Sequence, residues 1–508
     1  MNIRSNHLLL IANAERHGER TAVVDSQVSL TYKDLLDASA RVATALLAGG
    51  DDLEEEPIAF LVKPGFAWVA IQWGIWRAGG LAVPLPLNST RSELEYFVED
   101  SRASTLVSDA SAASMLEPIS AARGVRTFEY DQIPASQPAE LPDVGEHRRA
   151  MILYTSGTTS KPKGVVTTHT NITAQIMCLV EAWEWSADDH IVLCLPLHHI
   201  HGIINVLSCA LWSGATCEIL PRFDADAVWD RIESGSVTLF MAVPTIYVKL
   251  IAAWERNSSG RRATLSQACA KLRLMVSGSA ALPVSTLELW KEISGHTLLE
   301  RYGMTEIGMA LSNLLRGERV PGSVGKPLPS VEVQLVGEKG EQVVPETPGE
   351  IEVRGPSVFA EYWGKPEATR DAFRDGWFRT GDTAVVENGV YRILGRTNID
   401  ILKTGGHKVS ALEIEEVLRR HPACAECAVV GVPDPEWGER VAVAVVLKDG
   451  NAMDLSALRA WGKEFLAAHK LPSQLLVLDG LPRNAMGKVM KPTVAAMFQT
   501  AANSDPVS

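Results

Sequence analysis

The 508-residue chain has no excess of basic residues, few cysteines and no long apolar run. Its net charge of −13 leaves no cationic surplus for phosphate backbones, which argues against general nucleic-acid binding. The seven cysteines are odd in number and scattered, as suits a reducing compartment. No segment has the length and composition of a signal peptide or a transmembrane helix. The sequence therefore predicts a cytoplasmic protein without a membrane partner.

Two of the cysteines, Cys424 and Cys427, form a CxxC pair without the second pair that a metal site would need. We interpret them as small apolar residues beside the strand-like run AVVGV.

Alternating strand-like and helix-like segments predict an α/β architecture with largely parallel sheets. Thr21–Asp25 and Pro57–Val62 are typical of buried strands, and Tyr32–Leu47 has the apolar spacing of a helix. After about Pro321 short runs such as VEVQLV and GVYRILG, with Pro and Gly between them, predict a compact β region. A new α/β pattern follows residue 395. We expect a large domain over 1–396, with layered sheets and a β subdomain, and a small α/β domain over 397–508.

A loop rich in hydroxyls and glycine follows the apolar run Ala150–Leu153. Residues 154–164 read YTSGTTSKPKG and precede Val165–Val166, which predicts a strand, a turn and a second ordered element. Glycine lets successive N–H groups converge on an anion, and the hydroxyls and lysines add donors and charge. The loop is not a Walker A loop, because GxxxxGK[ST] is absent. On this segment alone, a polar surface loop is an open alternative.

Three other polar segments bear on the same question. RYGMTE, at residues 301–306, combines a ring, a hydroxyl and a carboxylate that suit a base, a phosphate and Mg²⁺. TGD, at 380–382, offers a carboxylate for ribose hydroxyls, and PRNAMGK, at 482–488, lies near the C-terminus. Each of them alone is better explained as a turn.

Together, and in this order, these segments resemble those of the adenylate-forming acyl-CoA synthetases, over nearly the whole chain. The resemblance implies two half-reactions. A carboxylate attacks the α-phosphorus of ATP to give an acyl-adenylate and pyrophosphate, and coenzyme A then displaces AMP. Such phosphoryl chemistry needs positioning and charge neutralisation rather than a protein nucleophile. We therefore propose no Ser-His-Asp or Cys-His constellation.

The resemblance also implies roles for individual residues. The phosphates of ATP would be held by Thr155, Ser156, Gly157, Thr158, Thr159 and Lys163. The rest of the nucleotide would contact Gly278, Ser279, Ala280, Tyr302, Gly303, Met304, Asp382 and Arg396. The catalytic residues would be Lys488, Thr305 and Glu306, with Glu306 also the ligand of Mg²⁺.

The two half-reactions imply a mobile C-terminal domain. The residues expected at its hinge and at the coenzyme A site are Asn398, Lys403, Gly405 and Gly406. The family commonly has Asp or Lys where this chain has Asn398, and the segment up to Gly405 is one residue longer than in many relatives. The pivot among Asn398, Ile399 and Asp400 is left open.

Two further features of the sequence suggest which carboxylic acid is the substrate. LPLHHIHG, at 195–202, places His201 where an apolar wall is usual for fatty or aromatic acids, and Arg319 precedes the Pro-Gly turn into the β region. Several runs, among them HHIHGIINVLSCALWSGAT, are similar to those of malonyl-CoA and methylmalonyl-CoA synthetases. That resemblance implies a distal-carboxylate site of His201, Ser277 or Ser279, and Arg319, and activity on malonate and also methylmalonate.

Other readings remain open. The chain could be a short-chain monocarboxylate–CoA ligase, a stand-alone adenylation domain that loads a carrier protein, or a nucleotide sensor without catalysis. The retained Glu306, Asp382 and Lys488 argue against the sensor. We expect a monomer or a homodimer.

Overall fold

The computed structural model describes residues 8–133, 140–155, 161–483 and 489–504, with side chains up to residue 500. It divides into two compact units. One consists of Met1–Leu282, Thr286–Val333 and Val353–Phe378, and the other of Pro283–Ser285, Gln334–Glu352 and Arg379–Ser508. The segments 334–352 and 379–396, which we placed in the large domain, thus cluster with the C-terminal unit.

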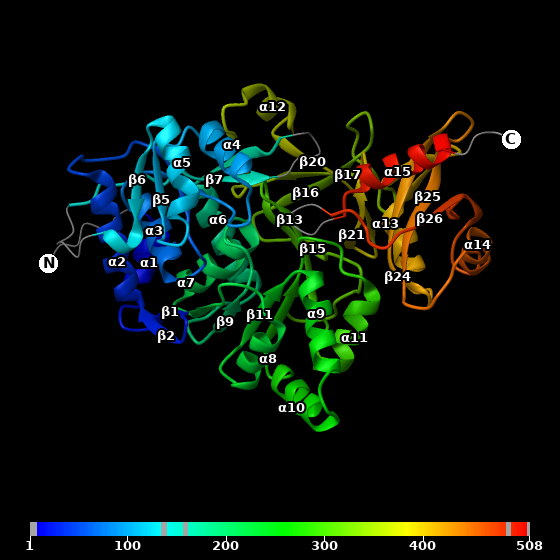
Figure 1. The fold of residues 1–508 in the computed structure, drawn as a ribbon, viewed down its shortest axis with the longest axis horizontal. Helices are drawn as coiled ribbons and strands as arrows, with labels where there is room; N and C mark the ends of the chain where they lie inside the picture. Colours follow the sequence, from blue (N-terminus) through cyan, green and yellow to red (C-terminus); the bar gives the residue numbers. More distant parts are fainter. Residues whose placement is uncertain (1–7, 134–139, 156–160, 484–488, 505–508) are drawn as a thin grey trace. The chain divides into compact units, whose positions relative to one another are not determined.

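The first unit contains two mainly parallel sheets (Figure 1). One sheet runs, in spatial order, β18 (Glu361–Tyr362), β8 (Lys163–Thr168), β7 (Arg149–Thr155), β4 (Leu81–Pro84), β3 (Pro57–Leu61), β5 (Thr105–Ser108) and β6 (Arg126–Glu129). The other runs β15 (Lys326–Pro327), β14 (Gly308–Ser312), β13 (Leu299–Met304), β12 (Leu274–Ser277), β11 (Leu239–Ala242), β9 (His190–Leu193), β10 (Thr216–Ile219), β1 (Thr21–Asp25) and β2 (Val28–Thr31).

Helices cover these sheets. They are α1 (Leu9–Glu15), α2 (Tyr32–Leu47), α3 (Phe66–Arg77), α4 (Arg91–Ser101), α5 (Ala113–Arg123), η1 (Tyr130–Gln132), α6 (His169–Ala182), η2 (His201–Ser208), α7 (Cys209–Ser213), α8 (Ala225–Glu233), α9 (Pro244–Glu255), α10 (Ser259–Cys269), α11 (Val284–Ser294) and α12 (Pro366–Asp371). α4 and α5 pack through residues such as Phe97 and Ile119 on the β3–β4–β5 sheet. α3 contacts β4 of that sheet and β1 of the other. It is buried nearly all round, as a helix between two sheets must be.

The helices and strands of the first unit confirm the predicted α/β fold, and some of them match the sequence prediction residue by residue. β1 and α2 have the bounds expected from the sequence. α2 begins where it does because Thr31 and Asp34 form a capping box, each side chain accepting the other's backbone N–H.

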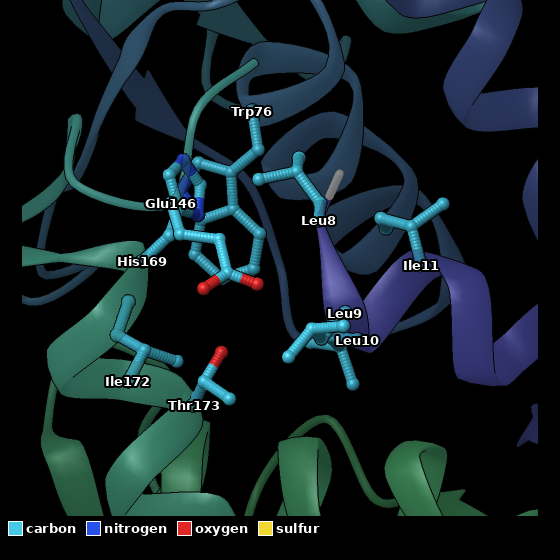
Figure 2. Close-up of a pocket in the computed structure, with 9 residues that line it drawn as sticks. All are labelled: Leu8, Leu9, Leu10, Ile11, Trp76, Glu146, His169, Ile172 and Thr173. Atoms are coloured by element: carbon cyan, nitrogen blue, oxygen red, sulfur yellow. The ribbon is translucent and has the colours of Figure 1, made fainter. Parts of the chain in front are cut away.

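A small pocket in this unit lies between Leu8–Ile11 and the side chains of Trp76, Glu146, His169, Ile172 and Thr173 (Figure 2). None of the predicted site residues within the described ranges lines it.

The β region expected after Pro321 is a sheet of order β16 (Glu332–Val336), β17 (Gly349–Arg354), β20 (Trp377–Glu387) and β19 (Phe373–Arg374), with β21 (Val390–Arg396) paired to β20. The C-terminal sheet has the order β23 (His407–Ser410), β22 (Ile401–Thr404), β25 (Gly438–Leu447) and β24 (Cys424–Asp434), with β26 (Gln474–Val477) on β25. The helices α13 (Ala411–Leu418), η3 (Ala468–Lys470), α14 (Leu455–Gly462) and α15 (Lys491–Ser504) accompany it.

Side-chain alternation along β24 gives this last sheet two apolar faces. Cys427 and Val429 pack with α13 and α14, whereas Ala428, Val430 and Val432 pack with α15. Cys424 and Cys427 are buried free thiols on the first of these faces. Within the described ranges, no helix is long and apolar enough to cross a bilayer.

Candidate active site

The predicted site residues are distributed over both units. Those between Thr155 and Arg319 belong to the first unit, and Asp382, Arg396 and the hinge residues belong to the second. Five of the predicted residues lie outside the described ranges, namely Ser156, Gly157, Thr158, Thr159 and Lys488.

The two ends of the expected phosphate loop are neighbours. β7 and β8 pair antiparallel, and Thr155 lies directly opposite Lys163. The Lys163 ammonium is 4.8 Å from the centre of the Tyr362 ring, which belongs to the next strand, β18. The pairing therefore brings a hydroxyl and a cation to the same end of the hairpin, where an anion would meet both.

Glu306 lies in the turn between β13 and β14 and is only 5% exposed. The Tyr362 hydroxyl donates a hydrogen bond of 3.0 Å to its Oε1, and its backbone oxygen accepts the Phe359 N–H at 2.8 Å. A buried carboxylate that is fixed by a neighbouring hydroxyl is a suitable oxygen ligand for Mg²⁺. Lys163, Tyr362 and Glu306 thus form one cluster, to which sequence reasoning assigned the first and the last.

Four polar side chains meet at the carboxyl end of β12. Ser277 ends that strand, and the Ser279 hydroxyl lies 3.3 Å from Nδ1 of His201, the first residue of the π-helix η2. Nη2 of Arg301, on the parallel strand β13, donates to the same hydroxyl at 3.3 Å. Carboxyl ends of parallel strands are where α/β proteins commonly bind ligands. We call His201, Ser277, Ser279 and Arg301 the polar cluster.

The backbone beside the polar cluster is shaped by close approach. A Cβ on Gly278 would lie 2.6 Å from Cζ of Arg301, so only glycine leaves room for the guanidinium. Ser279 has φ +69°, a left-handed conformation that costs energy for a residue other than glycine. Such strain is often found at binding sites.

Arg301 is a buried cation on β13. It is 3% exposed, and among the described residues no carboxylate pairs with it. Burial lowers the pKa of Arg301 to about 9, which still leaves it charged at neutral pH. Desolvation of an unpaired charge is costly, so this position strongly favours an incoming anion.

His201 is neutral beside that cation. Burial, followed by the charge of Arg301 and the neighbouring His199, holds the pKa of His201 well below its ordinary value. Its Nε2, the Ser277 hydroxyl and Nε of Arg301 are buried and have no hydrogen-bond partner among the described residues. Several buried polar atoms in the polar cluster are therefore available to a ligand.

Arg319, to which we assigned the substrate carboxylate, does not join the polar cluster. Its guanidinium donates to three backbone carbonyls, those of Thr297 at 2.6 Å, Leu315 at 2.9 Å and Leu314 at 3.1 Å. It therefore fastens the loop after β14. The arginine in the polar cluster is Arg301, to which sequence reasoning gave no role of its own within RYGMTE. The available signal was the pair of charged residues, Glu300 and Arg301, that directly follows two leucines in LLERYGM.

In the second unit, the two predicted ribose contacts lie side by side. Asp382 and Arg396 are cross-strand partners on β20 and β21. Nε of Arg396 is 3.0 Å from Oδ1 of Asp382, and its Nη1 donates to the Thr380 carbonyl at 2.8 Å. Asp382 is 7% exposed, so one carboxylate is held in place by an arginine.

The hinge residues form two turns in the same unit. Asn398 is exposed at the turn after β21, and Gly405 and Gly406 form the turn between β22 and β23 with φ +55° and +78°. Lys403, on β22, is exposed, and its backbone N–H donates to Glu439.

The sequence profile of the AMP-binding enzyme family matches residues 10–363, and that of the AMP-binding enzyme C-terminal domain matches residues 413–488. The chain therefore belongs to the AMP-binding enzyme family. The α/β fold and the acyl-CoA synthetase resemblance are confirmed. The protein is an AMP-forming acid–CoA ligase that uses ATP, Mg²⁺ and coenzyme A.

Particular relatives narrow the comparison. The mitochondrial malonate–CoA ligase ACSF3 of Bos taurus is 46% identical, over 94% of this chain and 88% of its own length. A malonate–CoA ligase of Arabidopsis thaliana is 40% identical, over 94% and 86%. The structure of ATP-bound MatB from Rhodopseudomonas palustris superposes with a TM-score of 0.88 at 32% identity, over 97% of this chain and 99% of its own.

The contact between Tyr362 and Glu306 leads to a test. Replacing Tyr362 by Phe removes the hydroxyl that orients the Glu306 carboxylate, and loss of such an outer contact to a metal ligand typically costs about 10–100-fold. We expect Tyr362→Phe to raise the Mg²⁺ concentration needed for half-maximal activity about tenfold, with little change in the KM of the acid. A titration of activity with Mg²⁺ would measure this, and an unchanged curve would contradict a metal-binding role for Glu306.

Proposed function

We propose that this protein joins malonate to coenzyme A at the expense of ATP, through a malonyl-adenylate, and releases AMP and pyrophosphate. The observation that carries the substrate is the buried, unpaired charge of Arg301 in the polar cluster. The names of the similar malonate–CoA ligases support it.

The polar cluster suits the distal carboxylate of a small dicarboxylic acid. An arginine fork matches a carboxylate in geometry, and the adjacent His201 and Ser277 can share its remaining hydrogen bonds. A monocarboxylate such as acetate would leave Arg301 buried and unpaired, and a site built for a polar group rejects the analogue that lacks it. Methylmalonate differs from malonate by one methyl group, worth roughly 1 kcal/mol or somewhat more, so we propose that both react.

The proximal carboxylate would react at the nucleotide. Thr155, Lys163 and the segment 156–160 would hold the terminal phosphates, Thr305 the α-phosphate, and Tyr302, Gly303, Met304 and Gly278–Ala280 the adenine. Asp382, fixed by Arg396, would bind the ribose. Glu306 would hold Mg²⁺, which when bound neutralises phosphate charge. Lys488 would supply a point charge to the pentacovalent centre.

We propose that the domain boundary of 396/397 is also the hinge. The Thr397 hydroxyl is 2.8 Å from that of Thr383 on β20, so Thr397 is held to the β region. Asp400 is buried, and its backbone oxygen accepts the N–H of Ala411 at the start of α13. Asn398 and Ile399 between these anchors are then the residues that we propose to change dihedral angles, with loss of the hydrogen bonds that the Ile399 and Asp400 N–H groups donate to the Arg396 carbonyl. Gly405, Gly406 and Lys403 would approach coenzyme A in the second half-reaction.

Three finer expectations are part of the proposal. Coenzyme A, rather than a carrier-protein thiol, is the acceptor, as in the names of the similar ligases. The protein is a monomer or a homodimer. Its compartment is the cytoplasm, although several similar ligases bear the word mitochondrial in their names. Fractionation of cells that express the natural gene would test the last point.

The first measurement is pyrophosphate and AMP release with ATP and Mg²⁺. The acids are malonate, methylmalonate, acetate, propionate and octanoate, each with and without coenzyme A. We expect turnover with malonate and methylmalonate only, with AMP release dependent on coenzyme A. Turnover with acetate or octanoate would leave acid activation intact but refute the dicarboxylate site. AMP release with malonate only when a carrier protein replaces coenzyme A would favour the carrier-loading alternative.

Variants of Arg301 and Arg319 should have opposite effects on malonate binding and on stability. Arg301→Met removes the proposed carboxylate partner, and such a loss typically costs about 2–5 kcal/mol, which lowers kcat/KM for malonate at least roughly 30-fold. Because the charge is unpaired, we expect no loss of thermal stability without ligand. Arg319→Ala should do the reverse. It removes three hydrogen bonds to backbone carbonyls in a partly exposed loop, each worth about 0.5–1.5 kcal/mol in stability, and leaves the KM for malonate nearly unchanged.

Thermal melts with and without malonate measure both effects at once. Malonate should stabilise the wild type and Arg319→Ala but not Arg301→Met. If Arg319→Ala instead abolished malonate binding in a folded protein, the original assignment of Arg319 would be restored.

A further inference from the structure

The second unit contains a buried cation, Lys491, that differs from Arg301 because two carboxylates pair with it. The Lys491 ammonium lies 2.5 Å from Oδ1 of Asp400 and 2.7 Å from Oε1 of Glu415. The side chains are 11%, 12% and 3% exposed, respectively. Burial alone would lower the pKa of Lys491, but the charges of Glu415 and Asp400 outweigh it and raise the pKa. The group is therefore a permanent cation between two carboxylates.

Both carboxylates are themselves fixed. Glu415 pairs with Arg419 at 2.8 Å, and its Oε1 accepts the N–H of Val429 on β24 at 2.9 Å. Asp400 accepts the N–H of Arg396 at 2.9 Å through Oδ2. Through these two carboxylates, Lys491 is connected to the turn after β21, which contains Asp400, to α13 and to β24.

Lys491 also begins α15, which packs on the sheet face opposite to α13 (Figure 1). The ion pairs therefore join elements from the two layers of this unit. An ion pair of this kind adds little stability over an apolar contact of the same volume, because desolvation offsets the attraction. What it does add is a defined position for the start of α15.

The chain just before Lys491 is closed into a stem. Arg483 and Val489 form an antiparallel bridge, and the Met490 N–H donates to the Pro482 carbonyl at 2.8 Å. Residues 484–488 connect the two sides of this stem, and Lys488 stands three positions before Lys491 in the sequence. Whatever fixes Lys491 therefore fixes the base of the segment that carries Lys488.

We infer that Lys491 is a positioning residue for Lys488. Its pairs with Asp400 and Glu415 hold the start of α15 to Asp400 and to α13, and with it the paired residues Pro482–Arg483 and Val489–Met490 that flank the segment containing Lys488. The inference rests on the proposed function, because it needs Lys488 to act in adenylation. It adds to that function a residue that touches neither substrate nor nucleotide.

The test separates the two half-reactions, because only adenylation would need Lys488. Adenylation is measured as malonate-dependent exchange of pyrophosphate into ATP. The other half-reaction is measured in reverse, as coenzyme A released from malonyl-CoA and AMP without pyrophosphate, with enzyme in excess. In that reaction AMP takes the malonyl group and coenzyme A leaves with its thiol proton restored.

The variants are Lys491→Met, which removes the charge at similar length, and Lys491→Arg, which keeps it. Asp400→Asn is isosteric and retains an acceptor for the Arg396 N–H, so it serves where Lys491→Met fails to fold. The matched control is Lys470→Met, since Lys470 pairs with Glu413 of α13 at 2.6 Å in the same unit but is not attached to the stem.

We expect Lys491→Met to lower the kcat of adenylation at least tenfold, with the KM of ATP and the release of coenzyme A changed less than twofold. A misplaced catalytic group can cost about 100-fold. Lys491→Arg should recover most of the loss, Asp400→Asn should show a smaller loss of the same pattern, and Lys470→Met should show none. Parallel loss of both half-reactions, or adenylation at the wild-type rate in folded Lys491→Met and Asp400→Asn, would overturn the positioning role.

Failure of the proposed function is seen separately, in the wild type. A wild-type chain without malonate-dependent exchange would refute malonate activation and the positioning role with it. An active wild type with a normal Lys491→Met variant would refute the positioning role alone.

Discussion

The guanidinium of Arg301 imposes the constraint around which the candidate site is built. It is a buried charge that no carboxylate of the described residues pairs with, so the surrounding backbone must make room for it and the surrounding side chains must tolerate it. Gly278 lacks the Cβ that would touch it, and Ser279 accepts a strained backbone while receiving its hydrogen bond. His201 stays neutral in its field. These costs are hard to explain by stability, and are explained by an anionic ligand that completes the site.

Comparison with Lys491 shows why the absence of a partner is informative. Both cations are largely buried, but Lys491 has two carboxylates within 2.7 Å, whereas none pairs with Arg301 among the described residues. A cation whose charge is satisfied inside the protein can only hold elements together. One whose charge is left unsatisfied is available for binding. The contacts alone, without any sequence motif, therefore indicate that Lys491 holds elements of the fold together and that Arg301 binds a ligand.

Much of the fold was predictable, because β1, α2 and α13 follow from local periodicity and capping signals such as Thr31 with Asp34. The family also followed from the order of four segments. The confusion of Arg319 with Arg301 shows the limit. Arg301 belongs to RYGMTE and Arg319 follows it in the sequence. The parallel register of β12 with β13 brings Arg301 to the polar cluster, whereas backbone carbonyls hold the Arg319 guanidinium elsewhere. Tyr362 was missed for the same reason, since its partner Glu306 is 56 positions away. Long-range pairing is not contained in local pattern.

The net charge of −13 would by itself repel a dicarboxylate and a nucleotide. At physiological ionic strength, however, exposed charges are screened over about 8 Å, so most of the surface carboxylates exert little force at the site. A buried cation is screened far less and acts at contact distance. Selectivity for an anion can therefore be set by one desolvated arginine inside an acidic protein, and the same desolvation that makes Arg301 costly makes it discriminating.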